Sequence, residues 1–395
     1  MAATGNAELA AALARSHEPA IVVDGGGRIL HANRRFAFST VSRGRTIGRH
    51  CFEICHNAER RCPGDECPLA AAWARMPLRR AVHIHRTAGI DLLTRIAVRP
   101  LTVGPSATYL MAFRTLNHVS AVPQGSGLVG RSAAFRRMVE QMDRVAEAPI
   151  PLLIVGEPGA GKEIVARTIH RMSRRMHEPF VIVDGPVTDA SLAGQDRVLP
   201  HLRFGDLLGR VGEGTLFVDQ VLGLTLFQQT MLLRLADAGL NLGRNVRRRA
   251  GSAPRLIAAS ETRLDALPPD TSFRADLADT LSIYPIEVPP LRDRIEDILL
   301  IAESVLLRLS VVARRAWRLT PAGAAYLQER DYPENVRELA YVVERAALAA
   351  PGDELGPDDF AFRDACLESG HAAEDRGRKP LRAHAGPGLG TRSNG

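Results

Sequence analysis

The sequence lacks a long hydrophobic run: no uninterrupted apolar stretch reaches the roughly 18 residues that a membrane-spanning helix needs. The first 19 residues are rich in alanine but include Glu8, and no basic start is followed by an apolar block. We therefore expect neither a membrane span nor a signal peptide, and a cytoplasmic location.

Lysine is also almost missing, since Lys162 and Lys379 are the only two lysines among 51 basic residues. A lysine that persists in such an arginine-biased chain indicates a chemical role. The formal net charge of +7 permits an acidic partner such as a nucleic acid or a nucleotide. It is weak evidence for one, because the charge is spread along the chain rather than gathered in a block.

At 395 residues the chain is long enough for about two to three domains, and its 45% hydrophobic and 24% charged residues exclude disorder throughout and a fibrous repeat. Short, mostly antiparallel strands predict an α+β domain over residues 1–116, followed by a linker over 117–127. Strands alternate with helices over 128–290, which predicts an α/β domain with a parallel sheet. Residues 291–350 have helical spacing throughout, and 351–395 have too few large apolar residues to avoid disorder.

A phosphate-binding loop is the clearest motif. Gly156-Glu157-Pro158-Gly159-Ala160-Gly161-Lys162 follows the apolar segment 152–155 and opens a helical stretch. In such a P-loop, backbone N–H groups at the helix N-terminus cradle phosphates and the lysine reaches the terminal ones. Glu163 departs from the usual pattern, because Ser or Thr normally stands there for Mg²⁺.

This departure is shared with one family. Residues 156–170 resemble the Walker A segment of the AAA+ domain in sigma-54-dependent transcriptional activators. Three later stretches agree in order: Gly214–Asp219 is similar to the Walker B strand, Pro289–Ile298 to the join with the lid, and Tyr332–Leu339 to the sensor II helix. The resemblance covers roughly residues 128–350, so we expect an AAA+ P-loop domain followed by a small helical lid.

The resemblance implies ATP or ADP with Mg²⁺ as ligands, and it assigns roles to single residues. Asp219 would hold Mg²⁺, Arg337 would reach the nucleotide from the lid, and Arg274 would reach the nucleotide of a neighbouring subunit. The residues implied at the phosphates are Gly156, Glu157, Gly159, Ala160, Gly161, Lys162 and Glu163.

The segment before the linker separately resembles a PAS sensor domain, through residues 21–33 and the strands after residue 81. PAS domains commonly precede this kind of ATPase. The combination implies a signal-sensing domain coupled to a transcription machine.

The chain departs from the family at positions that serve hydrolysis. Gln220 replaces the glutamate that polarises the attacking water, and loss of a general base costs about 10²–10⁴-fold in rate. Thr280 replaces the second arginine that acts across subunits, a type of residue worth about 10³–10⁵ in rate. Asp184 stands where the family has the asparagine of its glutamate switch, and Glu261 occupies the sensor I position. We expect nucleotide binding to survive and hydrolysis to be weak.

Two further family features are missing. Residues 189–212 lack the Gly-Ala-Phe-Thr-Gly-Ala loop that touches sigma-54, so contact with sigma-54 RNA polymerase is in doubt. The 45 residues after Ala350 offer no helix-turn-helix, and we expect no direct sequence-specific DNA binding. The expected partners are further copies of the chain or an intact relative, in a homo-oligomer or a hetero-oligomer.

Four cysteines, Cys51, Cys55, Cys62 and Cys67, lie within 17 residues. Four thiolates would suit zinc or an iron–sulfur cluster, low-pKa thiols would suit redox sensing, and structural burial is the third alternative. His83 and His85 alternate along one strand as possible additional ligands, although solvated strand histidines are the expectation.

Three functional interpretations remain. The first is an ATP-binding transcriptional regulator with little turnover. The second is a functional ATPase activator of sigma-54 RNA polymerase in which Gln220 and Thr280 are compensated from elsewhere. The third is a PAS redox or metal sensor whose ATPase region is only a scaffold.

Overall fold

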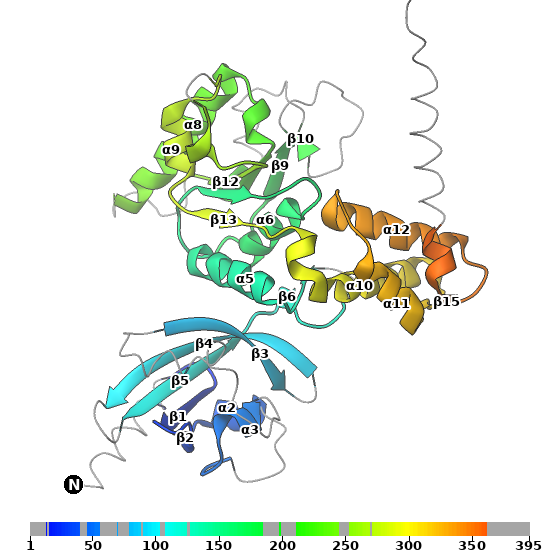
Figure 1. Cartoon of the computed structure of the whole chain (residues 1–395). Helices are drawn as coiled ribbons and strands as arrows, with labels where there is room; N and C mark the ends of the chain where they lie inside the picture. The colour runs from blue at the N-terminus through cyan, green and yellow to red at the C-terminus, as the bar shows by residue number, and fades with distance from the viewer. Residues whose placement is uncertain are drawn as a thin grey trace, which may run out of the picture.

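A computed structural model describes residue 13 and residues 16–361, apart from 40–45, 56–68, 70–78, 88–89, 103–106, 125–126, 185–196, 199–210, 245–252 and 269–270. Within that part of the chain, three units follow one another: an N-terminal domain, a P-loop domain and a helical lid (Figure 1). None of the helices described is long and apolar enough to cross a membrane.

The N-terminal domain is built on an antiparallel sheet whose described strands have the order β2-β1-β5-β4-β3. A hairpin joins β1 and β2, and Asp24 Oδ1 closes its turn by accepting hydrogen bonds from the N–H groups of Gly26 and Arg28. This is the α+β domain that the PAS resemblance implies. Its elements are β1 (Ala20–Asp24), β2 (Ile29–Ala32), α2 (Arg34–Ser39), α3 (Cys51–Cys55), β3 (Arg79–Thr87), β4 (Ile90–Thr102) and β5 (Thr108–Thr115).

The two faces of this sheet are used differently. Ile96, Met111 and Phe113 pack on the helical side and form the core of the domain. Val82 and Leu93, on the other face, join the core of the P-loop domain. The alternation along β3 and β4 therefore fixes a domain contact as well as a domain core.

The segment 117–127, which the sequence predicts as a linker, contains a short packed strand. β6 (Val119–Ser120) pairs in parallel with β7 (Leu128–Val129), and Val119 and Ala121 are buried. The chain is therefore held against the P-loop domain where it passes between the two units.

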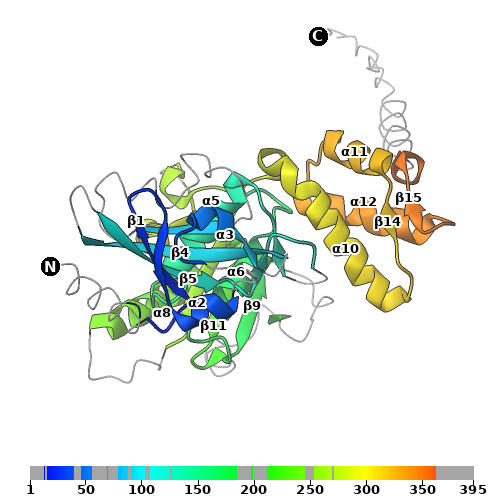
Figure 2. The same cartoon turned by 90° about the horizontal axis from the view of Figure 1, so that it is seen from below.

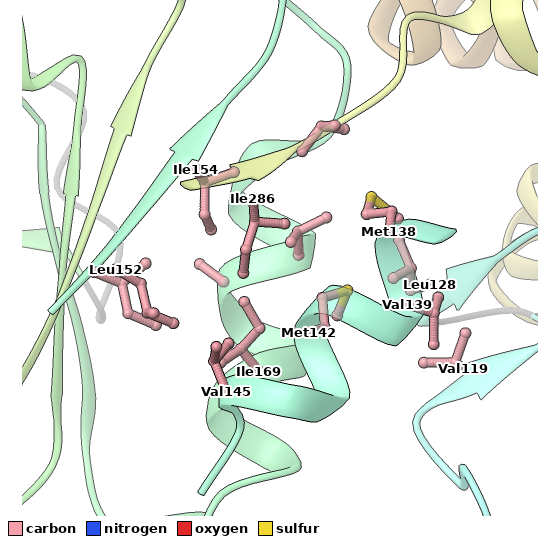
Figure 3. Packing of buried hydrophobic residues seen from close by; sticks show 14 of the residues in the cluster. Val119, Leu128, Met138, Val139, Met142, Val145, Leu152, Ile154, Ile169 and Ile286 are labelled. Carbon is pink, nitrogen blue, oxygen red and sulfur yellow. The ribbon is translucent and has the colours of Figure 1, made fainter. Parts of the chain in front are cut away.

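The P-loop domain has a parallel sheet of order β10-β9-β11-β12-β8-β13 among the described strands, as the apolar segments predict. Helices α5 and α6 cover one face, where their apolar residues pack against β8 and β13 (Figure 3). The elements are α5 (Ala133–Val145), β8 (Leu152–Val155), α6 (Lys162–Arg171), β9 (Phe180–Asp184), β10 (Arg197–Val198), β11 (Thr215–Asp219), η2 (Val221–Gly223), α8 (Leu226–Arg244), β12 (Arg255–Ser260), η3 (Leu264–Ala266), α9 (Ala275–Leu281) and β13 (Pro285–Glu287).

The lid is a small helical unit beside the sheet (Figure 2). Thr320 caps the helix that begins at Pro321, since Thr320 Oγ1 accepts a hydrogen bond from the N–H of Gly323. The lid elements are η4 (Leu291–Asp297), α10 (Ile298–Ala313), β14 (Arg318–Leu319), α11 (Pro321–Glu329), α12 (Asn335–Ala349) and β15 (Glu354–Leu355).

The lid continues beyond residue 350, where the sequence analysis places the start of a disordered tail. β15 pairs with β14, and Leu355 and Phe360 are buried in the lid core. The Phe360 ring also stacks on Tyr326, with 6.1 Å between the ring centroids. The low number of large apolar residues after residue 350 was misleading, because two of them, Leu355 and Phe360, are enough to extend the lid core.

Candidate functional site

The phosphate loop joins the end of β8 to the start of α6. Gly159 and Gly161 have φ angles of +70° and +104°, a left-handed region that glycine enters without steric cost. The loop is tied to the sheet, because the N–H of Gly156 donates to the carbonyl of Ser260 at 3.1 Å. The first N–H groups of α6 have no partner within the helix and can bind an anion.

Lys162 lies at the centre of this loop. Its Nζ donates to the carbonyl oxygens of Gly156 at 2.7 Å and Glu157 at 3.0 Å. Burial lowers the pKa of Lys162, while the charges of Asp219 and Glu261 raise it and that of Arg337 lowers it. Three charged groups are therefore near the lysine: one at the end of β11, one directly after β12 and one in the lid.

The end of β11 carries the predicted Mg²⁺ ligand. Asp219 Oδ1 accepts a hydrogen bond from the N–H of Gln220 at 2.9 Å. Gln220 itself is exposed and has a left-handed φ of +49°, which a residue other than glycine adopts at a cost. The strand end thus presents a carboxylate followed by an amide.

Glu157 is directed to the lid. Its carboxylate accepts two hydrogen bonds from Arg292, at 2.8 and 2.5 Å, and one from Asn335 Nδ2 at 3.1 Å. The hydrogen bonds from Arg292, followed by that from Asn335, lower the pKa of Glu157 to about 2. We call Glu157, Arg292 and Asn335 the loop–lid clamp. It gives the Glu157 carboxylate a partner other than the phosphates predicted from the sequence.

The lid also contacts the loop through its backbone. The N–H of Arg337 donates to the carbonyl of Gly159 at 3.2 Å, and Asn335 Nδ2 donates to the carbonyl of Pro158 at 3.0 Å. A Cβ atom at Gly159 would collide with the carbonyl of Glu334. Gly159 is therefore required both by its φ angle and by the closeness of the lid.

A small cleft of about 170 Å³ adjoins the loop between the P-loop domain and the lid. Mostly apolar residues line it, including Leu128, Val129, Ile301 and Val305. Arg294 is the buried polar exception, and its Nη2 donates to the carbonyl of Ala160 at 2.8 Å. Burial lowers the pKa of Arg294 to about 10. An apolar cleft next to a phosphate loop suits a planar base.

Two predicted residues have local partners. Glu163 pairs with Arg167 one turn further along α6, with 3.0 Å between the nitrogen and the oxygen. Arg274 lies at the start of α9, where it forms a bidentate pair with Asp276 and a hydrogen bond of 3.3 Å to Thr230. These contacts hold Arg274 on the α8–α9 side rather than at Lys162 of the same chain.

The cysteine cluster is only partly within the described residues. Cys51 and Cys55 lie on α3 in the core of the N-terminal domain, while Cys62 and Cys67 lie outside the described part of the chain. Burial raises the pKa of the Cys55 thiol well above its usual value. No group of three or more metal-ligating side chains occurs among the residues that the structure describes. The cluster as a metal site remains a prediction.

His83 and His85 correct one expectation. They are buried, with 6% and 4% of their surface exposed, and the ring of His85 lies 5.1 Å from that of Phe113. The expectation of solvated histidines was wrong because this face of β3 packs on the helical side of its own domain.

Sequence reasoning missed three side chains near the loop: Arg292, Arg294 and Asn335. The first two lie in the segment recognised only as the join to the lid, and Asn335 in the one recognised as the sensor II helix. Asn335 is buried and has a φ of +53°, which asparagine tolerates better than most residues. Its place within the segment Tyr332–Leu339, at the start of α12, was the available signal.

Family models match the chain from residue 129 onward: residues 129–291 match the sigma-54 interaction domain, and residues 292–376 match the AAA+ ATPase lid domain. The chain is 37% identical to the nitric oxide reductase transcription regulator NorR2 of Cupriavidus necator, over 67% of this chain and 52% of that protein. It is 30% identical to the response regulator protein PilR of Pseudomonas aeruginosa, over 76% of this chain and 69% of that protein.

Among solved structures, NtrX from Brucella abortus in complex with ADP is 29% identical, with a TM-score of 0.48 over 59% of this chain and 54% of that one. The chain spans about half the length of its curated relatives NorR2 and NorR1 of Cupriavidus necator. The likeness to PilR over more than two thirds of both chains, together with both domain matches, is decisive for the family. The chain therefore belongs to the sigma-54-dependent transcriptional regulators and carries their sigma-54 interaction domain and AAA+ lid.

Proposed function

We propose that the chain is an ATP- or ADP-binding transcriptional regulator that senses a signal through its PAS domain and hydrolyses ATP weakly. The observation that carries this proposal is the gathering of Lys162, Asp219 and Arg337 around a loop with two left-handed glycines. The apolar cleft beside the loop supports it, since adenine needs such a surface next to its phosphates.

The residues fit the nucleotide in named positions. The N–H groups at the start of α6 and the Lys162 ammonium would hold the phosphates, with Arg337 adding charge from the lid. Lys162 now donates to two loop carbonyls, and phosphate oxygens would be stronger acceptors for the same ammonium. Asp219 would hold Mg²⁺, which would neutralise phosphate charge.

We expect weak hydrolysis because of two residues, Gln220 and Thr280, at the positions that serve catalysis in the family. The Gln220 amide can orient a water molecule but cannot accept its proton. Thr280 cannot stabilise the charge that develops on the transferring phosphate of a neighbouring subunit. Its hydroxyl donates to the carbonyl of Asp276 within α9, at 2.8 Å. Arg274 is exposed enough to reach a second subunit once its pair with Asp276 opens.

The partners in this proposal are further copies of the chain or an intact relative, and sigma-54 RNA polymerase. Residues 185–196 and 199–210, where the family has its sigma-contacting loop, lie outside the described residues. In a mixed oligomer, a subunit that binds but hardly hydrolyses nucleotide would limit the turnover of its neighbours.

One observation favours the alternative of a functional ATPase activator. Glu261 follows β12, and its charge acts on Lys162 alongside that of Asp219. It supplies a second carboxylate near the loop that could replace the base lost at Gln220. Among the described residues, nothing comparable replaces the arginine that the resemblance implies at position 280.

The test combines a titration with a fluorescent ATP analogue and a steady-state ATPase assay on the full chain. We expect the wild-type chain to bind the analogue and to turn over ATP far more slowly than an intact family member. Lys162→Ala should bind about 100-fold more weakly, because charge-assisted contacts to phosphate are lost. Lys379→Ala is the matched control and should leave the affinity unchanged. Equal affinity of wild type and Lys162→Ala would exclude the phosphate loop as the binding site, and ordinary turnover would favour the alternative.

A further inference from the structure

A second cavity lies between the N-terminal domain and the P-loop domain, on the α5–α6 side of the parallel sheet. Its volume is about 800 Å³, within the range of roughly 300–1,000 Å³ typical of small-molecule sites. β4, β5 and the turn after β5 form one wall. The end of α5 and the turn after α6 form the other. We call this cavity the interdomain cleft.

Arginines dominate the lining of the interdomain cleft, and they come from both walls. The cationic residues are Arg95, Arg114, Arg144, Arg171 and Arg174, against the carboxylates of Asp143 and Glu147. The cleft therefore has an excess of positive charge, which attracts anions.

Carboxylates neutralise only part of this charge. Arg95 donates to Asp143 at 3.3 Å and to Glu18 at 3.4 Å, so its charge is compensated. The side chains of Arg95 and Asp143 are mostly buried, at 15% and 9% exposed. Glu147 is shared between Arg114 and Arg174, each 3.8 Å away, too far for a good hydrogen bond. Most of the N–H donors of Arg114 and Arg174 are therefore available to hydrogen-bond a ligand.

The charges of Arg144 and Arg171 are neutralised even less. Neither forms an ion pair with a carboxylate of the residues that the structure describes, and both are exposed to the cleft side of their helices. Arg171 also acts on His118, whose pKa is lowered first by burial and then by the charge of Arg171. The positive electrostatic potential of the P-loop domain therefore extends to the turn after β5.

The negative end of α5 does not cancel this field. Its last carbonyls, those of Val145 and Ala146, each accept a hydrogen bond of 2.6 Å from Arg255. Arg255 is 4% exposed and lies behind Ala146, which lines the cleft. A buried cation therefore neutralises the helix end that would otherwise repel an anion.

From these observations we propose that the interdomain cleft binds a compact small-molecule polyanion, carrying phosphate or carboxylate groups, that bridges the sensor sheet and the P-loop domain. The planar fork of arginine matches the oxygens of both groups. Arg114 would contact the ligand from the sensor side, and Arg144 and Arg171 from the ATPase side. Such a ligand strengthens the contact between the two domains and gives the ATPase unit a site of regulation separate from the phosphate loop.

The site is tested by isothermal titration of the full chain with inorganic pyrophosphate and, in a second arm, with citrate. Stronger binding of pyrophosphate assigns the site to phosphate ligands, and stronger binding of citrate assigns it to carboxylates. Both titrations are repeated with Lys162→Ala, which disables the phosphate loop. Binding that persists in Lys162→Ala supports the interdomain cleft, whatever the outcome for ATP.

The deciding variant is Arg144→Gln with Arg171→Gln, in the Lys162→Ala background. We expect at least a tenfold loss of affinity for the better probe, because two charge-assisted contacts are removed. Arg318→Gln, an exposed arginine on β14, is the matched control and should change the affinity less than about twofold. Circular dichroism checks that each variant is folded.

Three results would overturn the proposal. They are no detectable binding of either probe, binding that disappears in Lys162→Ala alone, and equal losses in the double glutamine variant and Arg318→Gln. The last result would show that the general charge of an arginine-rich surface, rather than the cleft, attracts the anion.

Discussion

The nucleotide site has two halves that differ in how complete they are. The half formed by the loop and the lid retains its glycines, Lys162 and Arg337, and it is bound together by the loop–lid clamp. The half formed by the ends of β11 and β12 and by α9 carries Gln220, Glu261 and Thr280 where the family resemblance implies other residues. In the proposed function, binding and hydrolysis use separate side chains, so one can persist where the other weakens.

This difference extends to how the two halves are held. Asn335 hydrogen-bonds the loop at Glu157 and Pro158 and also accepts from the N–H of Leu291 at 2.7 Å. Gln220, in contrast, is exposed, and Arg274 is partly exposed. The binding half is thus completed within one chain, while the role proposed for Arg274 requires a neighbouring chain.

The largest expected effect comes from repairing the hydrolytic half. In the proposed roles, Gln220→Glu would supply a general base and Thr280→Arg a positive charge for the neighbour's phosphate. Each single change should do little, and the double variant should raise ATP turnover by about 10³-fold or more, beyond the product of the singles. Steady-state phosphate release measures this. Full rescue by either single change would show that the two positions do not act together.

The binding half is challenged by Gly159→Ala, with Gly161→Ala as the matched control. Both changes place a side chain at a left-handed φ, which costs about 1–3 kcal/mol. Only at Gly159 does the new Cβ also meet the lid, at the carbonyl of Glu334, whereas at Gly161 the nearest atom is the Ile164 side chain at 3.3 Å. The melting temperature of the P-loop domain and lid should therefore fall further in Gly159→Ala. Equal decreases in melting temperature would mean that the lid moves away from the new Cβ atom at no cost in stability.

A variant at Glu261 distinguishes the regulator with little turnover from the functional ATPase activator. If it only adds negative charge near the phosphates, Glu261→Asn should tighten ATP binding about fivefold, through roughly 1 kcal/mol of relieved repulsion, and leave turnover low. If it replaces the missing base, the same variant should abolish the turnover that remains. Glu329→Gln, an exposed carboxylate on α11, serves as the control in both assays.

The sequence was sufficient for the strands of the parallel sheet, because buried parallel strands are continuous apolar segments such as 152–155 and 256–259. It also located the loop between β8 and α6 that ends at Lys162, since the loop motif depends on local spacing, and the role of Lys162 at the phosphates stays a prediction. It could not pair Glu157 with Arg292, which is 135 residues away, because no local pattern encodes that contact. It missed the burial of His83 and His85 for the same reason, since the fold decides which face of β3 is covered.

The smallest expected effect is the pH dependence of the loop–lid clamp. The pKa of Glu157 in the folded protein is about 2, against an ordinary value of 4.5, so the charged form favours the folded state. The stabilisation is fully present above pH 4.5 and is lost as the pH falls from there towards 2. Because Arg292 and Glu157 remain 65% and 38% exposed, solvent screens the pair and we expect only a small contribution to stability.

Glu157→Gln should therefore lower the melting temperature slightly at about pH 7, and the difference from wild type should shrink below pH 4.5. Repeating the comparison in an Arg292→Gln background isolates the pair, because the pH-dependent part should disappear when the guanidinium is absent. A difference between wild type and Glu157→Gln that stays constant from about pH 7 to about pH 3 would mean that neutral hydrogen bonds, such as that from Asn335, hold the loop to the lid. In that case the binding half would owe its order to packing and amide contacts rather than to charge.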